Sequence, residues 1–475
     1  MYNQLQSTRR SFLLNAAQLS GALGLAEGIA PMFGAEPQNC AGPKTPIPVK
    51  WTPDNNPILP RLPASTLNAA EMAKLRSAYA ALRNLAVTRP NDPRGWLQQG
   101  DKHCWNCGGG LDGQAGEEIH GSWLFLPWHR AFLYFHERIL GALINDKNLR
   151  LAYWDWNNAA HRAVPPAWVT PNTSANSLFD ANRSAVAGSQ VPNSLVGPAI
   201  MNPILAAPTF ANFGGSSNAA GQLENGPHGA VHIWCGNTNL SSARVDMGLL
   251  DTAAQDPIFF AHHANIDRLW DVWLKAATTH KNPTDSAWLN HRFTFWDEKS
   301  RLVYITVADV INMSNNLRYT YGPQIIHFPF NLENPTFLRL TPDSNRNIIL
   351  PDQVKSRITA ANSVNQQRLT TLRVEGVTLP PNAKGIYRIV ANKPSASAGE
   401  ITEAPNDLGY IAIVPRTSQD SGGHMHGSVN LDLDVTGKLP PLLRENGKLS
   451  LSYVPMAGES NGTQLNYQSV YLIER

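Results

Sequence analysis

Histidines gather in two stretches of this chain, and these stretches constrain its fold more than any other feature. The seven residues are His103, His120, His129, His228, His232, His262 and His263. Neutral imidazole is the commonest protein ligand for copper, zinc and iron, so each stretch is a candidate half of a metal centre. Acidic ligands are absent from both sets, and all-nitrogen sites favour copper, whereas two-metal hydrolases use bridging carboxylates. The sequence therefore predicts a fold that brings distant segments together around metal.

The first stretch does not fit one continuous helix. His120 and His129 are nine residues apart, which corresponds to about 900° of helix and would place them on opposite faces. Pro127 resolves this conflict, because proline fits the first turn of a helix and ends whatever precedes it. We therefore expect His120 in a loop and His129 at the start of a helix over residues 128–144.

The second stretch contains two predicted helix starts. Pro227 opens the first helix and places His228 and His232 four residues apart on one face, a spacing suited to a shared metal. The second helix is predicted to be capped by Asp256 and to run to about residue 275. Both starts depend on a proline or a capping side chain immediately before an apolar run.

Two positions of this last helix leave alternatives open. The adjacent His262 and His263 lie about 100° apart on a helix, so only one of them can face a given metal. Periodicity does not choose between them, because both faces of the helix are apolar. Asp267 follows His263 by four residues and could orient a ligand or pair with Arg268. We adopt a structural role in the helix for Asp267.

The rest of the chain predicts a mainly α protein followed by an all-β domain. Apolar residues recur at helical spacing from a cap at Ser65 to about residue 86. Strand-like patterns cover residues 292–311, and from residue 364 short alternating strands are separated by Gly, Pro and Asn. The last pattern is typical of a β-sandwich, here of about 110 residues.

Composition excludes two classes of partner. The formal net charge is +3, and charged residues make up 16% of the 475 residues, which is too weak a bias to indicate nucleic acid or an anionic membrane. Basic and aromatic residues form no common stripe, and no apolar run has the length of a membrane span. We therefore expect neither nucleic-acid binding nor stable membrane association.

The N-terminus has the pattern of an export signal. Arg9 and Arg10 precede Phe12, and a modest apolar run covers residues 16–30. Twin arginines before such a run are typical of a bacterial twin-arginine signal. We expect residues 1–35 to be this signal, with the twin-arginine machinery as partner and a periplasmic or secreted location in a bacterium.

Four cysteines are too few for a disulfide scaffold in a chain of this size. They are Cys40, Cys104, Cys107 and Cys235. The Cys-x-x-Cys pair at Cys104 and Cys107 could be a redox pair or half of a zinc site. The chain has no second Cys-x-x-Cys motif, which weakens the zinc alternative.

Four long motifs resemble one family. HCWNC, HGSWLFLPWHRAFLYFHERIL, PHGAVHIW and DPIFFAHHANIDRLW are similar to the tyrosinase and catechol oxidase (polyphenol oxidase) family, especially its plant-type members, and the resemblance covers residues 36–475. It implies a helical-bundle, type-3 dicopper domain over residues 36–325 and a linker over residues 326–365. Residues 366–475 would form a β-sandwich that shields the copper site.

The resemblance also assigns six ligands and two copper ions. They are His103, His120 and His129 for copper A, and His228, His232 and His263 for copper B. Of the adjacent histidine pair, the family pattern thus selects the second.

The same resemblance assigns the cysteines. Cys107 matches the position that forms a thioether to the ring of His120. Cys104 matches a half-cystine whose partner would be Cys40, and Cys235 is expected to be a buried free thiol.

Three more positions follow from the family pattern. Glu224, four residues before His228, matches a glutamate that holds water and could help to deprotonate a phenol. Gly229 stands at the activity-controller position, where efficient monophenol hydroxylases often have Asn, and Leu250 stands at the gate position, where many plant enzymes have Phe.

The implied activity is oxidation of o-diphenols to o-quinones with O2, with weak or conditional monophenol hydroxylation. The alternatives are a true tyrosinase with strong monophenolase activity and a haemocyanin-like O2-binding protein. Expected partners are O2, small phenols and catechols, and a copper chaperone.

Overall fold

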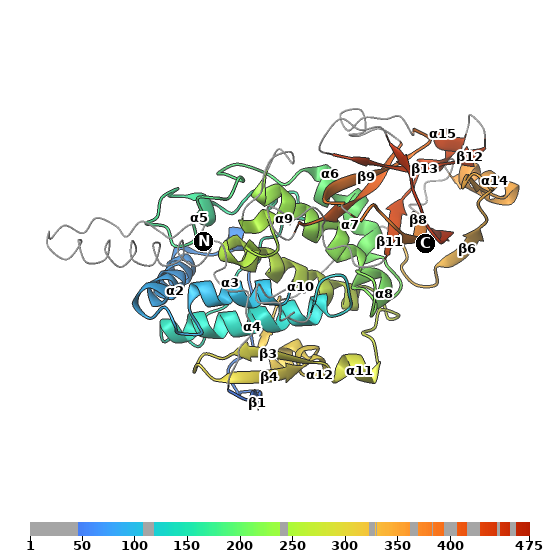
Figure 1. Cartoon of the computed structure of the whole chain (residues 1–475). Helices are drawn as coiled ribbons and strands as arrows, with labels where there is room; N and C mark the ends of the chain where they lie inside the picture. Colours follow the sequence, from blue (N-terminus) through green and yellow to red (C-terminus); the bar gives the residue numbers. More distant parts are fainter. Residues whose placement is uncertain are drawn as a thin grey trace, which may run out of the picture. The chain divides into compact units, whose positions relative to one another are not determined.

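The structure is a computed structural model of the chain, shown in Figure 1. It describes residues 46–107, 118–237, 246–322, 328, 330–361, 369–381, 383–393, 406–415, 428–443, 447–456 and 462–475. The predicted export signal and Cys40 lie outside these residues.

Four helices of ten or more residues form the core of the helical domain (Figure 1). They are α2 (Ala69–Thr88), α3 (Trp96–Trp105), α4 (Phe125–Leu143) and α10 (Ile258–Ala276). Helices α4 and α10 pack against each other, and almost every residue of both is buried. A helix that is buried on all sides belongs in the interior of a large domain, and there α4 carries His129 and α10 carries His263.

Shorter helices connect and cover these four. They are α5 (Pro166–Val169), α6 (Asn193–Val196), α7 (Pro198–Leu205), α8 (Phe210–Phe213), α9 (Gly229–Gly236), α11 (Ser286–Leu289), α12 (Val307–Val310) and α13 (Met313–Asn316). Single helical turns follow the 3₁₀ pattern at Ala64–Thr66, Asp246–Gly248 and Ala253–Gln255.

The helix starts were largely predictable from their caps. Pro127 lies in the first turn of α4, and the carboxylate of Asp256 accepts a hydrogen bond from the backbone N–H of Ile258 at 2.9 Å. The predicted start of α2 at Ser65 was wrong. Asn68 caps this helix instead, in a capping box with Glu71, because an amide oxygen competes well for the free N–H groups of a first turn.

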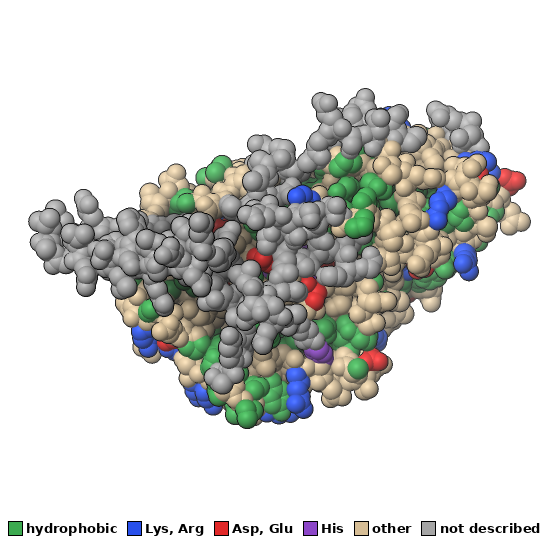
Figure 2. Space-filling model, viewed as in Figure 1, with side chains coloured by type: hydrophobic (Ala, Val, Ile, Leu, Met, Phe, Trp, Pro, Cys, Tyr) green, Lys and Arg blue, Asp and Glu red, His purple; other side chains and the backbone are tan. Residues whose placement is uncertain are grey.

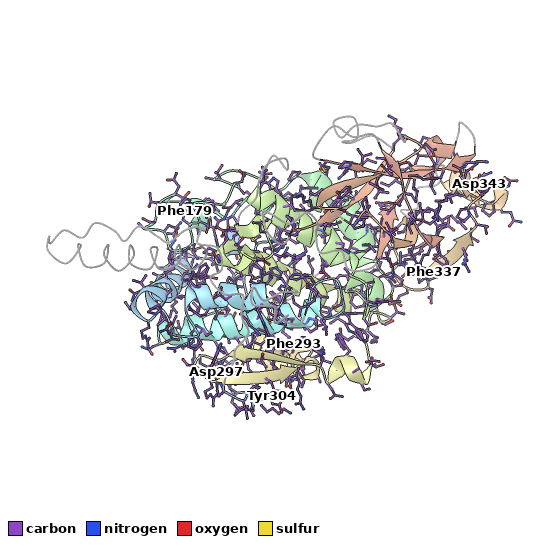
Figure 3. All side chains as sticks on the ribbon, in the orientation of Figure 1. Phe179, Phe293, Asp297, Tyr304, Phe337 and Asp343 are labelled. Atoms are coloured by element: carbon purple, nitrogen blue, oxygen red, sulfur yellow. The ribbon has the colours of Figure 1, made fainter. Side chains whose placement is uncertain are left out.

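A short antiparallel hairpin lies against the helices. Strands β3 (Arg292–Trp296) and β4 (Leu302–Thr306) pair, and Phe293, Asp297 and Tyr304 of this hairpin are labelled in Figure 3. The carboxylate of Asp297 closes the turn by accepting backbone N–H groups. β1 (Val49–Lys50) extends this sheet alongside β4.

The strand predicted to continue to residue 311 was too long. Residues Val307–Val310 form α12, because Thr306 and Asp309 make a capping box that starts a helix. Two further short strands, β2 (Leu59–Pro60) and β5 (Tyr319–Thr320), pair in parallel.

The C-terminal region is a sandwich of two antiparallel sheets, as predicted. One sheet has the order β10-β9-β13-β14, and the other has the order β11-β8-β15-β6. The strands are β6 (Thr336–Leu340), β8 (Thr370–Val377), β9 (Gly385–Ala391), β10 (Asp407–Ile413), β11 (Val429–Asp434), β13 (Leu451–Pro455), β14 (Thr463–Gln464) and β15 (Ser469–Glu474). Apolar side chains of both sheets share one core, as expected for stacked sheets.

The segment predicted as a linker has structure of its own. Strand β6 lies within it and pairs with β15 at the edge of the second sheet. The same segment contains β7 (Ile348–Ile349), which pairs with β12 (Lys448–Leu449), and helix α14 (Asp352–Ala361). Helix α15 (Leu439–Leu443) packs near α14.

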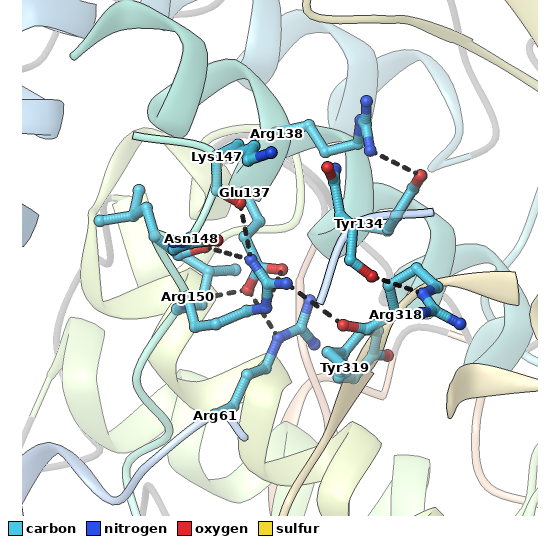
Figure 4. A network of polar contacts seen from close by, with 12 residues as sticks. Arg61, Tyr134, Glu137, Arg138, Lys147, Asn148, Arg150, Arg318 and Tyr319 are labelled. Atoms are coloured by element: carbon cyan, nitrogen blue, oxygen red, sulfur yellow. Dashed lines mark hydrogen bonds and ion pairs between the residues drawn. The ribbon is translucent and has the colours of Figure 1, made fainter. Parts of the chain in front are cut away.

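A buried polar network ties the N-terminal segment to α4, α10 and the end of the domain. Its members are Arg61, Arg130, Glu137, Asp267, Tyr319 and Tyr321. Arg61 lies between Glu137 and Tyr319, as Figure 4 shows, and its guanidinium donates to the carboxylate of Glu137 at 2.9 Å. Removing one partner of such a buried pair costs about 3–5 kcal/mol, because the other charge is left uncompensated.

Asp267 has a structural role, as expected, and its partners differ from Arg268, which was one of the alternatives that the sequence left open. Its carboxylate accepts from Arg61, Arg130 and both tyrosines. Arg268 instead donates to Asp155 at 2.7 Å. The reason is the direction of the side chain: neighbouring positions of a helix point about 100° apart.

Charged side chains of both signs lie on the described part of the face in view. Figure 2 shows basic and acidic side chains scattered among polar and apolar ones on this face. Among the residues that the structure describes, no helix combines the length and the apolar character needed to cross a membrane.

Candidate metal centre

The three histidines of the first stretch converge from two helices and a loop. His103 lies on α3, His120 lies just before α4, and His129 lies in the first turns of α4. Their ring centroids are 5.3 to 5.6 Å apart, and all three side chains are buried. The structure therefore brings the predicted set together.

The second set converges in the same way. His228 ends a turn of π-helix (Glu224–His228), His232 lies on α9, and His263 lies on α10. Their ring centroids are 4.6 to 5.3 Å apart. The Nε2 atoms of His232 and His263 are 3.1 Å apart, so both rings point at one place.

The two sets adjoin each other. The rings of His129 and His263 stack with centroids 4.1 Å apart, and those of His120 and His228 lie 6.3 Å apart. Helices α4 and α10 cross at this point, and their packing is what places one set beside the other. The result is one buried centre with two histidine groups.

Backbone carbonyls orient four of the six rings. The pairs are His103 Nδ1 with Leu250 at 2.9 Å, His129 with Phe125 at 2.9 Å, His228 with Glu224 at 3.2 Å and His232 with Met247 at 2.8 Å. A carbonyl only accepts, so each Nδ1 carries the hydrogen and each Nε2 keeps a lone pair. This hydrogen-bonding pattern is typical of histidines that bind a metal.

Proximity alone does not separate His262 from His263. Ring nitrogens of both lie within 4.8 Å of those of His228 and His232. Their surroundings differ, because the indole N–H of Trp156 donates to Nδ1 of His262 at 3.0 Å. Nothing in the motif spacing indicated this contact, since Trp156 lies 106 residues away along the chain.

Cys107 lies inside the first group. Its side chain is buried and forms no disulfide within the described residues. The sulfur lies 3.1 Å from the carbonyl oxygen of His103 and 3.5 Å from Nδ1 of the same residue. His103, Cys107 and His120 form a group whose potential ligand atoms are all within 4.8 Å. The thiol thus reaches both rings, and it is closer to His103 than the predicted pairing implies.

Glu224 faces the centre from the π-helical turn. One carboxylate oxygen accepts the backbone N–H of Gly121 at 2.7 Å, and the other has no partner among the described residues. Gly121 has a positive φ of 72°, which turns its N–H toward the carboxylate. Burial raises the pKa of Glu224 well above its ordinary value, and the N–H of Gly121 opposes this rise.

Gly229 and Leu250 both contact the C-terminal domain. A Cβ at Gly229 would lie 2.9 Å from the carbonyl oxygen of Ala412 on β10. The backbone N–H of Leu250 donates to the carbonyl of Pro415 at 2.9 Å, just beyond the end of β10. Position 250 therefore lies between this strand and His103, whose ring bonds to the Leu250 carbonyl.

The donor set fits metal ions. The Nε2 atoms of His120, His129 and His228 are buried without a hydrogen-bond partner in the described part of the chain. Burial lowers the pKa of His232 to about 3, and it lowers the pKa of His103, His129, His228 and His263 well below the ordinary value. Neutral rings with buried, unpaired lone pairs are what a bound metal requires.

Comparisons with known proteins agree with this geometry. The model described as the common central domain of tyrosinase matches residues 80–197 and 170–276, and the polyphenol oxidase middle domain matches residues 282–330. The latent polyphenol oxidase of Prunus armeniaca, named as chloroplastic, is 33% identical over 369 residues, which cover 69% of this chain and 58% of that protein.

Two solved structures extend the likeness. The crystal structure of a Vitis vinifera polyphenol oxidase is 31% identical with a TM-score of 0.54, over 64% of this chain and 96% of that one. Latent apple tyrosinase shares the fold, with 24% identity and a TM-score of 0.64 over 90% of this chain and 100% of that one.

The chain belongs to the plant-type polyphenol oxidase and tyrosinase family. It spans little more than half the length of the curated relatives it matches, 58% and 50% for two of them.

The predicted bacterial export and periplasmic or secreted location were wrong. The curated relatives are plant enzymes named as chloroplastic. The physical reason lies in composition, because residues 1–26 contain arginine and serine and no acidic residue. Chloroplast transit peptides share this character, so the composition of the segment does not distinguish the two kinds of leader.

Acid is expected to destabilise the metal-free protein. A histidine in an unfolded chain titrates near pH ~6.5, whereas burial lowers the pKa of His232 in the folded chain to about 3. The unfolded state therefore binds the proton first, and stability falls by about 1.4 kcal/mol per pH unit for this histidine as pH drops below ~6.5. The urea midpoint of metal-free protein at pH 7 and pH 5 measures the effect. An equal or higher midpoint at pH 5 would contradict it.

Proposed function

We propose that this chain is a dicopper polyphenol oxidase that oxidises o-diphenols to o-quinones with O2. The observation that carries the proposal is the pair of adjoining, buried, all-imidazole groups without a carboxylate ligand. Such a donor set favours copper over the metals of two-metal hydrolases. Family membership supports the same reaction class.

Six histidines would hold the copper ions. They are His103, His120 and His129 for one ion, and His228, His232 and His263 for the other. When bound, the copper pair would supply the redox chemistry by which one O2 takes four electrons and four protons from two catechols and leaves as two water molecules. The chain contributes neutral, buried rings and excludes water from them.

Glu224 is the proposed proton acceptor from the phenol. Its second carboxylate oxygen is buried and has no partner among the described residues, so a water or a phenol hydroxyl can reach it. The raised pKa of this carboxyl makes it a stronger proton acceptor than an ordinary carboxylate. The N–H of Gly121 fixes the other oxygen and so holds the carboxylate in one orientation.

Hydroxylation of monophenols is proposed to be weak. Gly229, at the activity-controller position, has no side chain to share a water with Glu224. Leu250, at the gate position, is smaller than the Phe of many plant enzymes and favours access. The alternative of a true tyrosinase requires strong hydroxylation despite Gly229, and an O2 carrier requires that catechol is not turned over.

The C-terminal sandwich is proposed to shield the copper centre. The hydroxyl of Tyr410 donates to the carbonyl of Leu195, and Arg388 donates to the carbonyl of Ser194 at 3.2 Å. Side chains of β9 and β10 also join the apolar core of the helical domain, namely Ile386, Tyr410 and Ala412. These contacts support a docked arrangement in which strand β10 covers Gly229.

Two covalent links are proposed. Cys107 would form a thioether to a ring carbon of His120, since its sulfur lies in one group with that ring. The thiol hydrogen and a ring hydrogen would be lost, with O2 as the oxidant. Cys104 would form a disulfide, and Cys40 is its proposed partner. Copper-loaded protein is expected to yield one peptide that joins Cys107 to His120 and survives reduction, detected by mass spectrometry. Two separate peptides after copper loading would contradict the thioether.

Catechol oxidation tests the activity. Copper-loaded full-length protein, before and after limited proteolysis, is expected to form quinone from catechol rapidly and from tyrosine slowly, followed by absorbance. Zinc-loaded protein is the control, since zinc has no accessible redox change. No quinone from catechol after proteolysis would exclude the enzyme, and equal rates with tyrosine would favour the tyrosinase alternative.

Loosening the docked strand is expected to activate the full chain. Tyr410→Phe removes one buried hydrogen bond, worth about 0.5–1.5 kcal/mol, and should raise activity without protease by roughly two- to tenfold. Tyr467→Phe is the matched control, because that hydroxyl also bonds a backbone carbonyl, of Arg346, but within the sandwich.

A side chain at position 229 is also expected to raise the activity of the full chain without protease. Gly229→Asn would press on the Ala412 carbonyl and displace β10, so activity on catechol should rise together with any gain on tyrosine. If proteolysis raises activity but neither Tyr410→Phe nor Gly229→Asn does, the contacts of β10 do not keep the C-terminal sandwich docked over the metal centre.

A further inference from the structure

One of the two adjacent histidines on α10 must be kept out of the metal centre. His262 and His263 are both fully buried, and both belong to the group of four rings whose nitrogens lie within 4.8 Å. The ring of His262 stacks on that of His228 with centroids 5.5 Å apart and lies 4.9 Å from that of His232. Distance alone would thus permit a fourth imidazole at the metal that His228, His232 and His263 are proposed to bind.

The hydrogen bond from Trp156 decides the tautomer of His262. An indole N–H is a donor only, so Nδ1 of His262 must be the acceptor of the 3.0 Å bond. A neutral imidazole has one hydrogen, which must then sit on Nε2. A nitrogen that carries hydrogen has no lone pair for a metal, and Nδ1 is occupied by the indole.

His262 has the opposite tautomer to four of the histidines proposed as ligands. In His103, His129, His228 and His232, Nδ1 meets a backbone carbonyl, which leaves the lone pair on Nε2. Nδ1 of His263 has no partner among the described residues, so its hydrogen can reside there when Nε2 faces a metal.

We propose that Trp156 is a positioning residue that decides which of the two adjacent histidines binds metal. By donating to His262 it holds that ring in a non-binding tautomer and leaves His263 as the third ligand. The proposal rests on the proposed dicopper function for its role, although the tautomer itself is a property of the protein without metal.

The tryptophan is fixed well enough for this role. Its side chain is fully buried, its backbone N–H donates to the carbonyl of Trp154 at 2.8 Å, and its own carbonyl accepts from Arg162. Rotating His262 toward the metal would leave the indole N–H buried without an acceptor. The indole of Trp156 and the ring of His262 therefore both favour the arrangement in which Nδ1 of His262 accepts the indole N–H.

Trp156→Phe tests the proposal, because it keeps an aromatic ring and removes the donor. In metal-free protein with ¹⁵N-labelled histidine, the ring nitrogens of His262 are expected to change from the Nε2–H to the Nδ1–H pattern. In zinc-loaded protein, X-ray absorption should show more imidazole per zinc. Zinc affinity is expected to rise roughly tenfold, the scale on which hydrogen bonds to ligand rings act.

Trp154→Phe is the matched control. Trp154 lies on the same segment, is equally buried, and donates its indole N–H to the carbonyl of Ala163 at 2.8 Å rather than to a histidine. Its variant should keep the wild-type tautomer and zinc affinity. An Nδ1–H pattern for His262 in the wild type, or the same response in both variants, would overturn the proposal.

A second pair of variants covers the case in which Trp156→Phe does not fold. His262→Asn keeps an acceptor for the indole and should bind two zinc ions per chain, whereas His263→Asn should lose one. Equal loss in both would place His262 among the ligands and overturn the proposal. Failure of catechol oxidation with these zinc results intact would reject the oxidase function alone.

Discussion

The metal centre depends on hydrogen bonds between imidazole Nδ1 atoms and backbone carbonyls. Two of these carbonyls, of Phe125 and Glu224, lie one turn before the histidine that they hold, so the local helix supplies them. The other two, of Met247 and Leu250, come from the short turns before α10. Two rings are thus oriented by their own helix, and two by a loop that must be positioned by the rest of the fold.

Charge is kept apart from this centre. Asp267 is only four residues from His263, yet its carboxylate bonds Arg61 and Arg130 one helical turn further along α10. The rings of Phe125 and Phe259 pack against the histidines instead. A carboxylate beside the rings would favour their protonation, so this separation preserves neutral ligands. There are two exceptions: Glu224, whose pKa is raised by burial, and Glu118, whose carboxylate lies 3.4 Å from Nδ1 of His120.

Much of this arrangement was predictable because it follows from short-range rules. Pro127 and Asp256 mark the helix starts correctly, and the alternating strands identify the sandwich. Contacts made by side chains far apart in sequence were not predictable: the bond from Trp156 to His262 and the approach of Ala412 to Gly229 leave no local signature. The sequence also misplaced the start of α2 and left the partner of Asp267 open, because several polar residues compete for one role there and packing decides.

The π-helical turn at Glu224–His228 has a consequence for how this site can change. Gly226 departs from helical geometry there, with φ −108° and ψ −114°, and Pro227 follows it. This turn sets the register between Glu224 and the two histidines after it. Loss or gain of one residue in the turn would rotate every later side chain by about 100° and carry His232 away from its metal. The site is therefore far less tolerant of a change in length than of a change in composition.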